Sequence, residues 1–318
     1  VGGDTIMINS GQAITIRGDG EKLITSDSGD VKLLVGSKDN GAGTLNLGDA
    51  GLTSGGSLDG TLSIADESTV NVRAGMFSIS TMEGTSSSAI TIGTAQNAGG
   101  LTVGKASLNG ANVFLDPAWK DGGNLVSDAS IGVFESFANG AVDGRFAVGR
   151  NSLLVLGDKD SAWAQKAVQD ALDNADLTWG KDSVTAALAI KSSQKLSATG
   201  ALLVDGSLAT APSVTENTAT FAGQSLLVVN AAAADGEGAL QGDGTSRLSV
   251  DGGAKLHIMD VKGSQEYTVT SGFVNDKIEG WQGDDLIVSR LFNAAVNTDG
   301  GKFVVKTEAK RPDEFSQY

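Results

Sequence analysis

The sequence predicts an all-β protein, a parallel β-helix or solenoid, with a helical insertion near residues 160–178. Three observations predict this class: short apolar strands recur with glycines behind them, 44 glycines accompany only 3 prolines, and aromatic residues make up 5% of the chain. Many sharp turns with few large core side chains suit a thin core repeated along a stack. A β-sandwich gives a similar spacing of strands and stays open as an alternative.

In the first half, the recurring unit is a pair of apolar residues in a short strand, followed by glycine. It occurs at residues 34–36, 45–48, 90–93, 101–104, 146–149 and 154–157, with similar strands lacking the glycine at 14–16, 62–64 and 70–72. Alternation sends one row of side chains inward. A glycine at the strand end allows a positive φ and hence a turn. One such coil cannot bury its own inner face, so the unit is stable only in a stack.

A helix is predicted from Ser161 to Leu177, because apolar residues there fall at helical spacing and no glycine or proline interrupts them. Asp160 or Ser161 can cap its first turn. We expect this helix to project from the stack or to lie against its side. The next segment, residues 184–190, alternates like a strand, but its alanine content also permits a helix.

Strands are expected again at residues 201–204, 218–221 and 226–229, and later at 285–288 and 303–305. Between them, residues 248–273 form three short strands joined by turns. We predict that this segment folds first and closes the end of the stack. Its expected inward residues are Leu248, Val250, Leu256, Ile258, Tyr267, Val269 and Phe273. The predicted division is 1–157 for the first coils, 158–197 for the insertion, 198–305 for the last coils and cap, and 306–318 for a linker or the start of a helix.

The charge and cysteine content limit the classes of partner and compartment. The formal net charge of −15 disfavours nucleic acid, whose phosphates such a surface repels. The absence of cysteine suits a bacterial exported protein, and also a cytosolic one. No apolar run is long enough to span a bilayer, and residues 1–10 lack the basic and apolar regions of a signal peptide. We expect that a signal precedes this sequence or has been removed.

Residues that could support catalysis or metal binding are few. His257 is the single histidine and is expected on the outer face of a strand, so a serine protease triad and a histidine or thiolate metal site are not predicted. Carboxylates at Asp116, Asp121, Asp128 and Glu135 could do acid–base work, but turn chemistry explains them better. Residues 280–288 half-match a calcium-binding nonapeptide in a single copy, and such sites need stacked copies. No cofactor is expected.

Three tryptophans are the candidate interaction residues. Trp119, Trp163 and Trp179 lie in a loop and near the ends of the predicted helix. Exposed tryptophans often anchor interfaces. The alternative is that each one covers the side of the stack, and the sequence does not decide between the two roles.

The segment 219–273, with ATFAGQSLLVVN and then GALQGDGTSRLSVDGGAKLHIMDVKGSQEYTVTSGF, resembles the conserved end of a bacterial autotransporter passenger domain. The Gly-, Thr- and Ser-rich strands before it are similar to passengers of the self-associating adhesin kind. The resemblance implies a right-handed parallel β-helix, exported through the periplasm and outer membrane by type V secretion, with residues 248–273 as an autochaperone. It also implies an outer-membrane β-barrel of the same protein, which this sequence does not include.

Three functions are open from the sequence. The first is a surface adhesin without catalysis, for cell–cell aggregation, host or matrix attachment, or biofilm. Its partners would be a host ligand or glycan, or identical chains on neighbouring cells. The second is a polysaccharide-active β-helix enzyme, which needs a groove lined by acidic and aromatic residues. The third is a phage or virion fibre, which needs a trimer.

Overall fold

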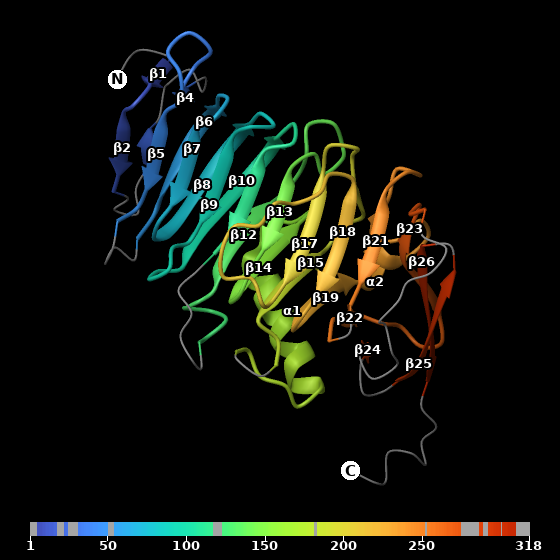
Figure 1. Ribbon diagram of the computed structural model, residues 1–318. Helices are drawn as coiled ribbons and strands as arrows, with labels where there is room; N and C mark the ends of the chain where they lie inside the picture. Colours follow the sequence, from blue (N-terminus) through green and yellow to red (C-terminus); the bar gives the residue numbers. More distant parts are fainter. Residues whose placement is uncertain are drawn as a thin grey trace.

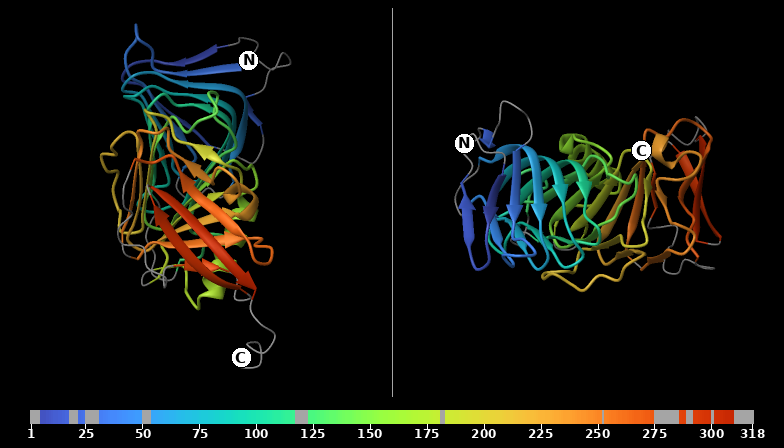
Figure 2. Two further views of the ribbon diagram at one scale, coloured as in Figure 1. Left: turned by 90° about the vertical axis from the view of Figure 1, so that its right-hand side faces the viewer. Right: turned by 90° about the horizontal axis from the view of Figure 1, so that it is seen from above.

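Parallel strands stack side by side along an elongated body in the computed structural model, from β1 at one end to a hairpin at the other (Figures 1 and 2). The structure describes residues 5–17, 22–24, 31–49, 54–116, 123–180, 183–251, 253–274, 286–288, 292–299 and 301–309. Each full coil visits three faces of the stack in turn. The predicted parallel β-helix with a small helical insertion is confirmed.

The register of strand pairs defines the three faces. The first face holds β3 (Lys22–Ile24), the leading parts of β6 (Gly56–Ile64), β8 (Gly75–Glu83) and β10 (Gly99–Ser107), then β12 (Ser130–Phe134), β14 (Ser152–Leu156), β15 (Ala186–Ile190), β19 (Ser225–Asn230), β22 (Lys255–Met259) and β24 (Leu286–Val288). The second face holds β1 (Thr5–Ile8), β4 (Val31–Val35), the trailing parts of β6, β8 and β10, then β16 (Gln194–Lys195), β20 (Leu240–Gln241) and β23 (Glu266–Ser271). The third face holds β2 (Ala13–Ile16), β5 (Thr44–Leu47), β7 (Thr69–Val72), β9 (Ala89–Ile92), β11 (Asn112–Leu115), β13 (Arg145–Val148), β17 (Ala201–Asp205), β18 (Thr218–Ala222) and β21 (Arg247–Val250).

The inner side chains of the three faces form one apolar core along the stack, because strand alternation points every second residue inward. Leu, Val and Ile fill most of it. The largest aromatic cluster joins Phe134, Phe137 and Phe146, with the rings of Phe134 and Phe146 edge to face at 4.8 Å between centroids. Such contacts add to the free energy gained by burial alone.

The Phe cluster lies where the regular coil is interrupted. The chain leaves the first face after β14 and returns to the same face as β15, and it leaves the third face after β17 and returns there as β18. On the second face, the segment 137–142 pairs with both neighbouring coils. Phe137 bridges to Ala106 of the coil before it, and Val142 bridges to Leu196 of the coil after it. Each face therefore gains one strand at this level, and the stack continues in register.

The first excursion contains helix α1 (Ser161–Asn174), which lies against the outer side of the first face and does not project from it (Figure 1). Asp160 is the N-cap and accepts hydrogen bonds from the backbone of Ala162 and Trp163. The buried helix residues are Ala164, Ala167, Val168, Ala171 and Leu172. They cover outward strand residues such as Ala187 and Ala189, whose small side chains let the helix approach closely.

Several sequence expectations need correction. The insertion is shorter than 158–197, because residues 186–190 form strand β15 inside the stack. The expected linker from residue 306 is wrong for its first residues, because β26 (Lys302–Ala309) continues to Ala309. The segment 248–273 is the last full coil but does not close the stack. A hairpin of β25 (Phe292–Asp299) and β26 pairs antiparallel with β23 and covers that end.

The glycine pattern is confirmed at four of its six positions. Gly36, Gly48, Gly93 and Gly157 have φ values of 70°, 76°, 94° and 76° and end their strands as expected, whereas Gly104 and Gly149 have no positive φ. Gly104 lies inside β10, where the strand bends from the first face to the second. A Cβ there would lie 2.9 Å from the carbonyl oxygen of Ser80, so close backbone approach and not the turn requires the glycine.

The surface position expected for His257 is wrong, because this residue is buried, with 4% of its surface exposed. Its direction is as predicted, because its neighbours Leu256 and Ile258 belong to the inner core and its register partner Val228 packs under α1. His257 does point to the outer side of the first face, but that side is itself covered, so the residue is buried.

Candidate functional site: a polar edge

The corner where the second face turns into the third is lined with serine, threonine, aspartate and asparagine. We call this row of turns the polar edge. It consists of residues 65–68, 84–88, 108–111, 143–145, 197–200, 215–218 and 243–246. The exposed members include Asp66, Ser86, Ser87, Asn109, Thr199, Thr215, Glu216 and Thr245.

Each turn of the polar edge is held by its own side chains. In the turn of residues 85–88, the Ser88 Oγ accepts from the backbone N–H of Thr85 at 3.0 Å and donates to the Thr85 carbonyl at 2.8 Å. Asn109 and Asn217 take φ values of 48° and 57°, which asparagine tolerates better than most residues. These local bonds explain why hydroxyl and amide residues recur at this corner.

Further hydrogen bonds join one turn to the next. Ser87 Oγ donates to the Asp66 carboxylate at 3.0 Å, Asn109 Nδ2 to the Gly84 carbonyl at 3.2 Å, and Asn217 Nδ2 to Thr245 Oγ1 at 2.8 Å. The polar edge is thus a ladder that runs along the rod.

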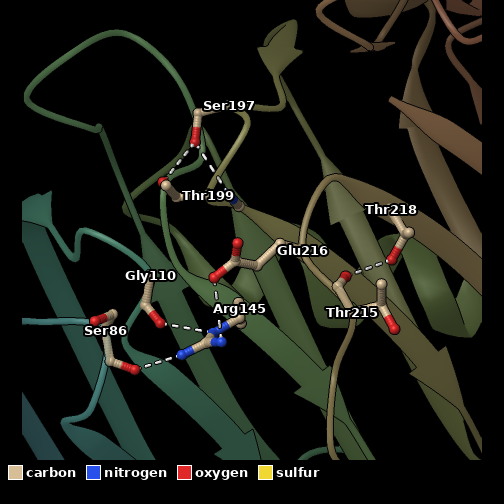
Figure 3. Close-up of polar contacts among 9 residues, drawn as sticks. Ser86, Gly110, Arg145, Ser197, Thr199, Thr215, Glu216 and Thr218 are labelled. Atoms are coloured by element: carbon tan, nitrogen blue, oxygen red, sulfur yellow. Dashed lines mark hydrogen bonds and ion pairs between the residues drawn. The ribbon is translucent and has the colours of Figure 1, made fainter. Parts of the chain in front are cut away.

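Arg145 is the central cation of the polar edge (Figure 3). Its Nε donates to the Gly110 carbonyl at 2.7 Å, its Nη2 donates to the Ser86 carbonyl, and its Nη1 lies 3.3 Å from Glu216 Oε1. Its side chain is only 17% exposed, whereas that of Glu216 is 50% exposed. The guanidinium therefore links four turns and leaves the Glu216 carboxylate facing outward.

Asp143 supports the same turn from inside. It is 4% exposed, and its carboxylate accepts from the backbone N–H groups of Leu108 at 3.1 Å and Asn109 at 3.2 Å. This buried acceptor satisfies backbone donors that would otherwise be unpaired.

Two carboxylates of the polar edge have a pKa below the ordinary value of an aspartate. The nearby side chain of Thr85 and then the hydrogen bond from Ser87 lower the pKa of Asp66. Hydrogen bonds from Thr245 and Ser246 lower the pKa of Asp243 to about 2. Donors to a carboxylate favour its ionised form. By contrast, burial raises the pKa of Asp116, which lies at a different corner.

The polar edge offers hydroxyls, amides and carboxylates at strand spacing on a rigid support. Such an array can bind an extended partner through many hydrogen bonds, each of modest net strength. Among the residues that the structure describes, no group of three His, Cys, Asp or Glu side chains could hold a metal ion. Within the same residues, no helix combines the length and the apolar character needed to cross a membrane.

The tryptophans predicted from the sequence do not form part of this edge. Trp179 is buried, and its Nε1 donates to Asn151 Oδ1, so it covers the side of the stack. Trp163 is half-buried against the α1 cluster, with Lys191 Nζ 5.2 Å from its ring centroid. Trp119 lies outside the described residues, as does Asp121. Asp128 accepts from the Asn124 N–H in its own turn, as expected of a turn residue.

The predicted folding segment forms a packed unit. All seven of its predicted inward residues are buried in the inner core, and they come from β21, β22 and β23, one strand on each face, and from the turn that follows β23. Its role in folding stays a prediction.

Sequence reasoning missed the polar edge, including Arg145, Asp143 and Glu216. A usable signal was present: short polar clusters such as DES at 66–68, TSSS at 85–88 and DGTS at 243–246 precede the strands of the third face. Their roles depend on pairs such as Ser86–Arg145, 59 residues apart. Comparison with protein-family models, with curated proteins and with solved structures finds no match in any of the three.

Proposed function

We propose that this chain is the passenger region of a bacterial autotransporter and acts at the cell surface as an adhesin, with the polar edge as its contact surface. The observation that supports this most is the row of exposed hydrogen-bonding side chains along one corner, several of them bonded from turn to turn, on a stack of parallel strands. Adhesion through such a surface needs no catalytic residue.

Identical chains are the favoured partners. Hydroxyl and amide groups both donate and accept, so two polar edges can pair with each other. An isologous contact between two copies uses the same surface on each. The exposed Thr199, Thr215 and Glu216 lie beside Arg145 near the middle of the edge, where a two-fold axis would bring them onto their own copies (Figure 3).

Sedimentation velocity over a wide range of concentrations tests this proposal. We expect an elongated monomer in dilute solution that self-associates as concentration rises. The double variant Ser86→Arg/Thr199→Arg places bulk on exposed positions of the edge and should stay monomeric. Thr210→Arg is the matched control, since Thr210 is exposed but lies outside the edge. A monomer at every concentration would contradict homotypic adhesion, and a stable trimer would favour the fibre.

A further inference from the structure

A second surface feature lies at a different corner, where the first face turns into the second. A groove of about 410 Å³ opens there and is lined by Val31, Lys32, Asp59, Gly60, Thr61, Ser80 and Thr81. Its volume is within the range of small-molecule sites. It forms because β6 and β8 bend at this corner instead of ending.

The bend places hydroxyls on the outside of the groove. In β8, Ile79 and Met82 both belong to the inner core, so Ser80 and Thr81 between them both face outward. In β6, Thr61 is the register partner of Thr81. Two threonines and a serine thus converge from adjacent strands about 4.8 Å apart.

These three hydroxyls are available for a ligand. Thr61 and Thr81 are half-buried and Ser80 is exposed, and none of the three side chains hydrogen-bonds to any part of the chain that the structure describes. On the polar edge, by contrast, the Ser88 hydroxyl bonds within its own turn and the Ser87 hydroxyl bonds to Asp66 of the neighbouring turn. Because each hydroxyl can donate one hydrogen bond and accept two, the groove offers a ligand both donors and acceptors.

The charges beside the groove are nearly balanced. Lys32 Nζ pairs with Glu83 Oε2 at 3.3 Å, and Asp59, which also lines the groove, has an interaction of its own within the chain. The whole chain has a formal net charge of −15, which repels polyanions. A neutral ligand is therefore favoured over a sulfated or carboxylated one.

We infer that this groove binds a neutral saccharide segment lying along the rod axis. Sugar rings present neighbouring hydroxyls that both donate and accept, which matches Thr61, Ser80 and Thr81. Lys32, which keeps its pairing with Glu83, has further N–H donors for one more sugar hydroxyl. The row Lys32, Thr61 and Thr81 continues in register to Lys105, so the site extends over successive strands, as a chain of linked sugars requires.

The test is saturation-transfer NMR with cellobiose, lactose and chitobiose as neutral probes and a sulfated chondroitin disaccharide as the anionic one. We expect transfer to at least one neutral probe and weaker transfer to the anionic one. Thr61→Val/Thr81→Val keeps β-branched side chains in both strands and should weaken binding about 10-fold or more, from the loss of two hydrogen bonds. Thr102→Val, a half-buried outward threonine of β10 outside the groove, is the matched control.

A second variant, Ser80→Trp, fills the groove from an exposed position and should also abolish transfer. No transfer from any neutral probe, or equal transfer with the double variant, would overturn the inference, as would a preference for the sulfated probe. The arginine variants of the polar edge should keep full transfer, so that failure of self-association and failure of saccharide binding are separately visible.

Discussion

Arg145 and Asp143 hold the polar edge by satisfying backbone groups of other coils. The Arg145 guanidinium donates to the carbonyls of Ser86 and Gly110 besides pairing with Glu216. Hydrogen bonds that involve a charged group contribute more than neutral ones. The ion pair adds little, since Glu216 is half exposed and solvent screens it.

Replacement of Arg145 by alanine should therefore lower the free energy of unfolding by about 1.5–3 kcal/mol. Glu216→Ala should change it by about 0–1 kcal/mol. Urea unfolding followed by circular dichroism measures both. Arg247→Ala is the control, because Arg247 occupies the same row of the third face and is exposed. An Arg145→Ala effect no larger than that of Arg247→Ala would show that the backbone contacts of Arg145 contribute nothing.

Asp243 makes part of the stability depend on pH. Its pKa in the folded chain is about 2, below the usual 3.8. Between these two pH values the carboxylate is mostly ionised in the folded chain and mostly protonated in the unfolded chain. This contribution is fully present above about pH 4 and is lost as the pH falls toward 2. Asp243→Asn should lower the unfolding temperature above pH 4, and its difference from the unaltered chain should vanish near pH 2. A difference that stays constant between pH 4 and pH 2 would refute this linkage.

At the scale of elements, helix α1 seals the outer side of the first face. Its buried stripe contacts strands β14, β15 and β19 across the point where the coil is interrupted. Leu172 is fully buried there. Leu172→Ala should cost about 2–5 kcal/mol in the free energy of unfolding, from lost burial and the cavity left behind. Gln169→Ala, on the exposed side of the same helix, should cost less than about 0.5 kcal/mol in the same measurement. Equal effects of the two substitutions would mean that α1 does not stabilise the stack.

The elements that the sequence predicts well are those with strong local periodicity. The helical spacing predicts a start at Ser161 and the helix begins there, and third-face strands such as β7 and β9 lie where the alternation indicates, whereas β11 was not predicted. Residues 184–190 are ambiguous in the sequence because alanine suits both states. Pairing of Ala186–Ile190 with β14 and β19 decides for a strand, and that pairing joins residues far apart in the sequence.

The sequence marks the polar clusters of the polar edge but not their alignment along one corner, and no local pattern marks the groove. Residues 81–88 look like a loop in the sequence, whereas β8 continues to Glu83 and its bend turns both Ser80 and Thr81 outward. His257 looks exposed until the outer side of its face is covered. Long-range contacts, and not local propensity, set these environments.

At the scale of the whole molecule, stability comes from stacking each coil on its neighbours. The coil of β21, β22 and β23 lies near the C-terminal end and contributes seven predicted core residues, among them Tyr267, whose hydroxyl donates to Gln265 and accepts from the Lys262 N–H. If it is the folding seed, the coils before it need its inner face as a template. Its position next to the closing hairpin suits that role.

Deletion of residues 248–273 should then slow or prevent refolding of everything before it. Refolding kinetics after dilution from urea, followed by circular dichroism, measure this. Replacement of residues 209–213, in the exposed loop between β17 and β18, by a glycine–serine segment of equal length is the control and should refold normally. Unchanged kinetics after the deletion would refute a seeding role.

The measurement that tests the central proposal most directly is the mobility of spin labels along the rod as the concentration rises. The chain has no cysteine, so single variants Ser87→Cys, Thr199→Cys and Thr245→Cys place one label each on the polar edge, and Thr210→Cys places one outside it. Self-association through the edge predicts that the three edge labels lose mobility with concentration while the label at position 210 does not. Edge labels that stay mobile while the chains associate would contradict the polar edge as the contact surface.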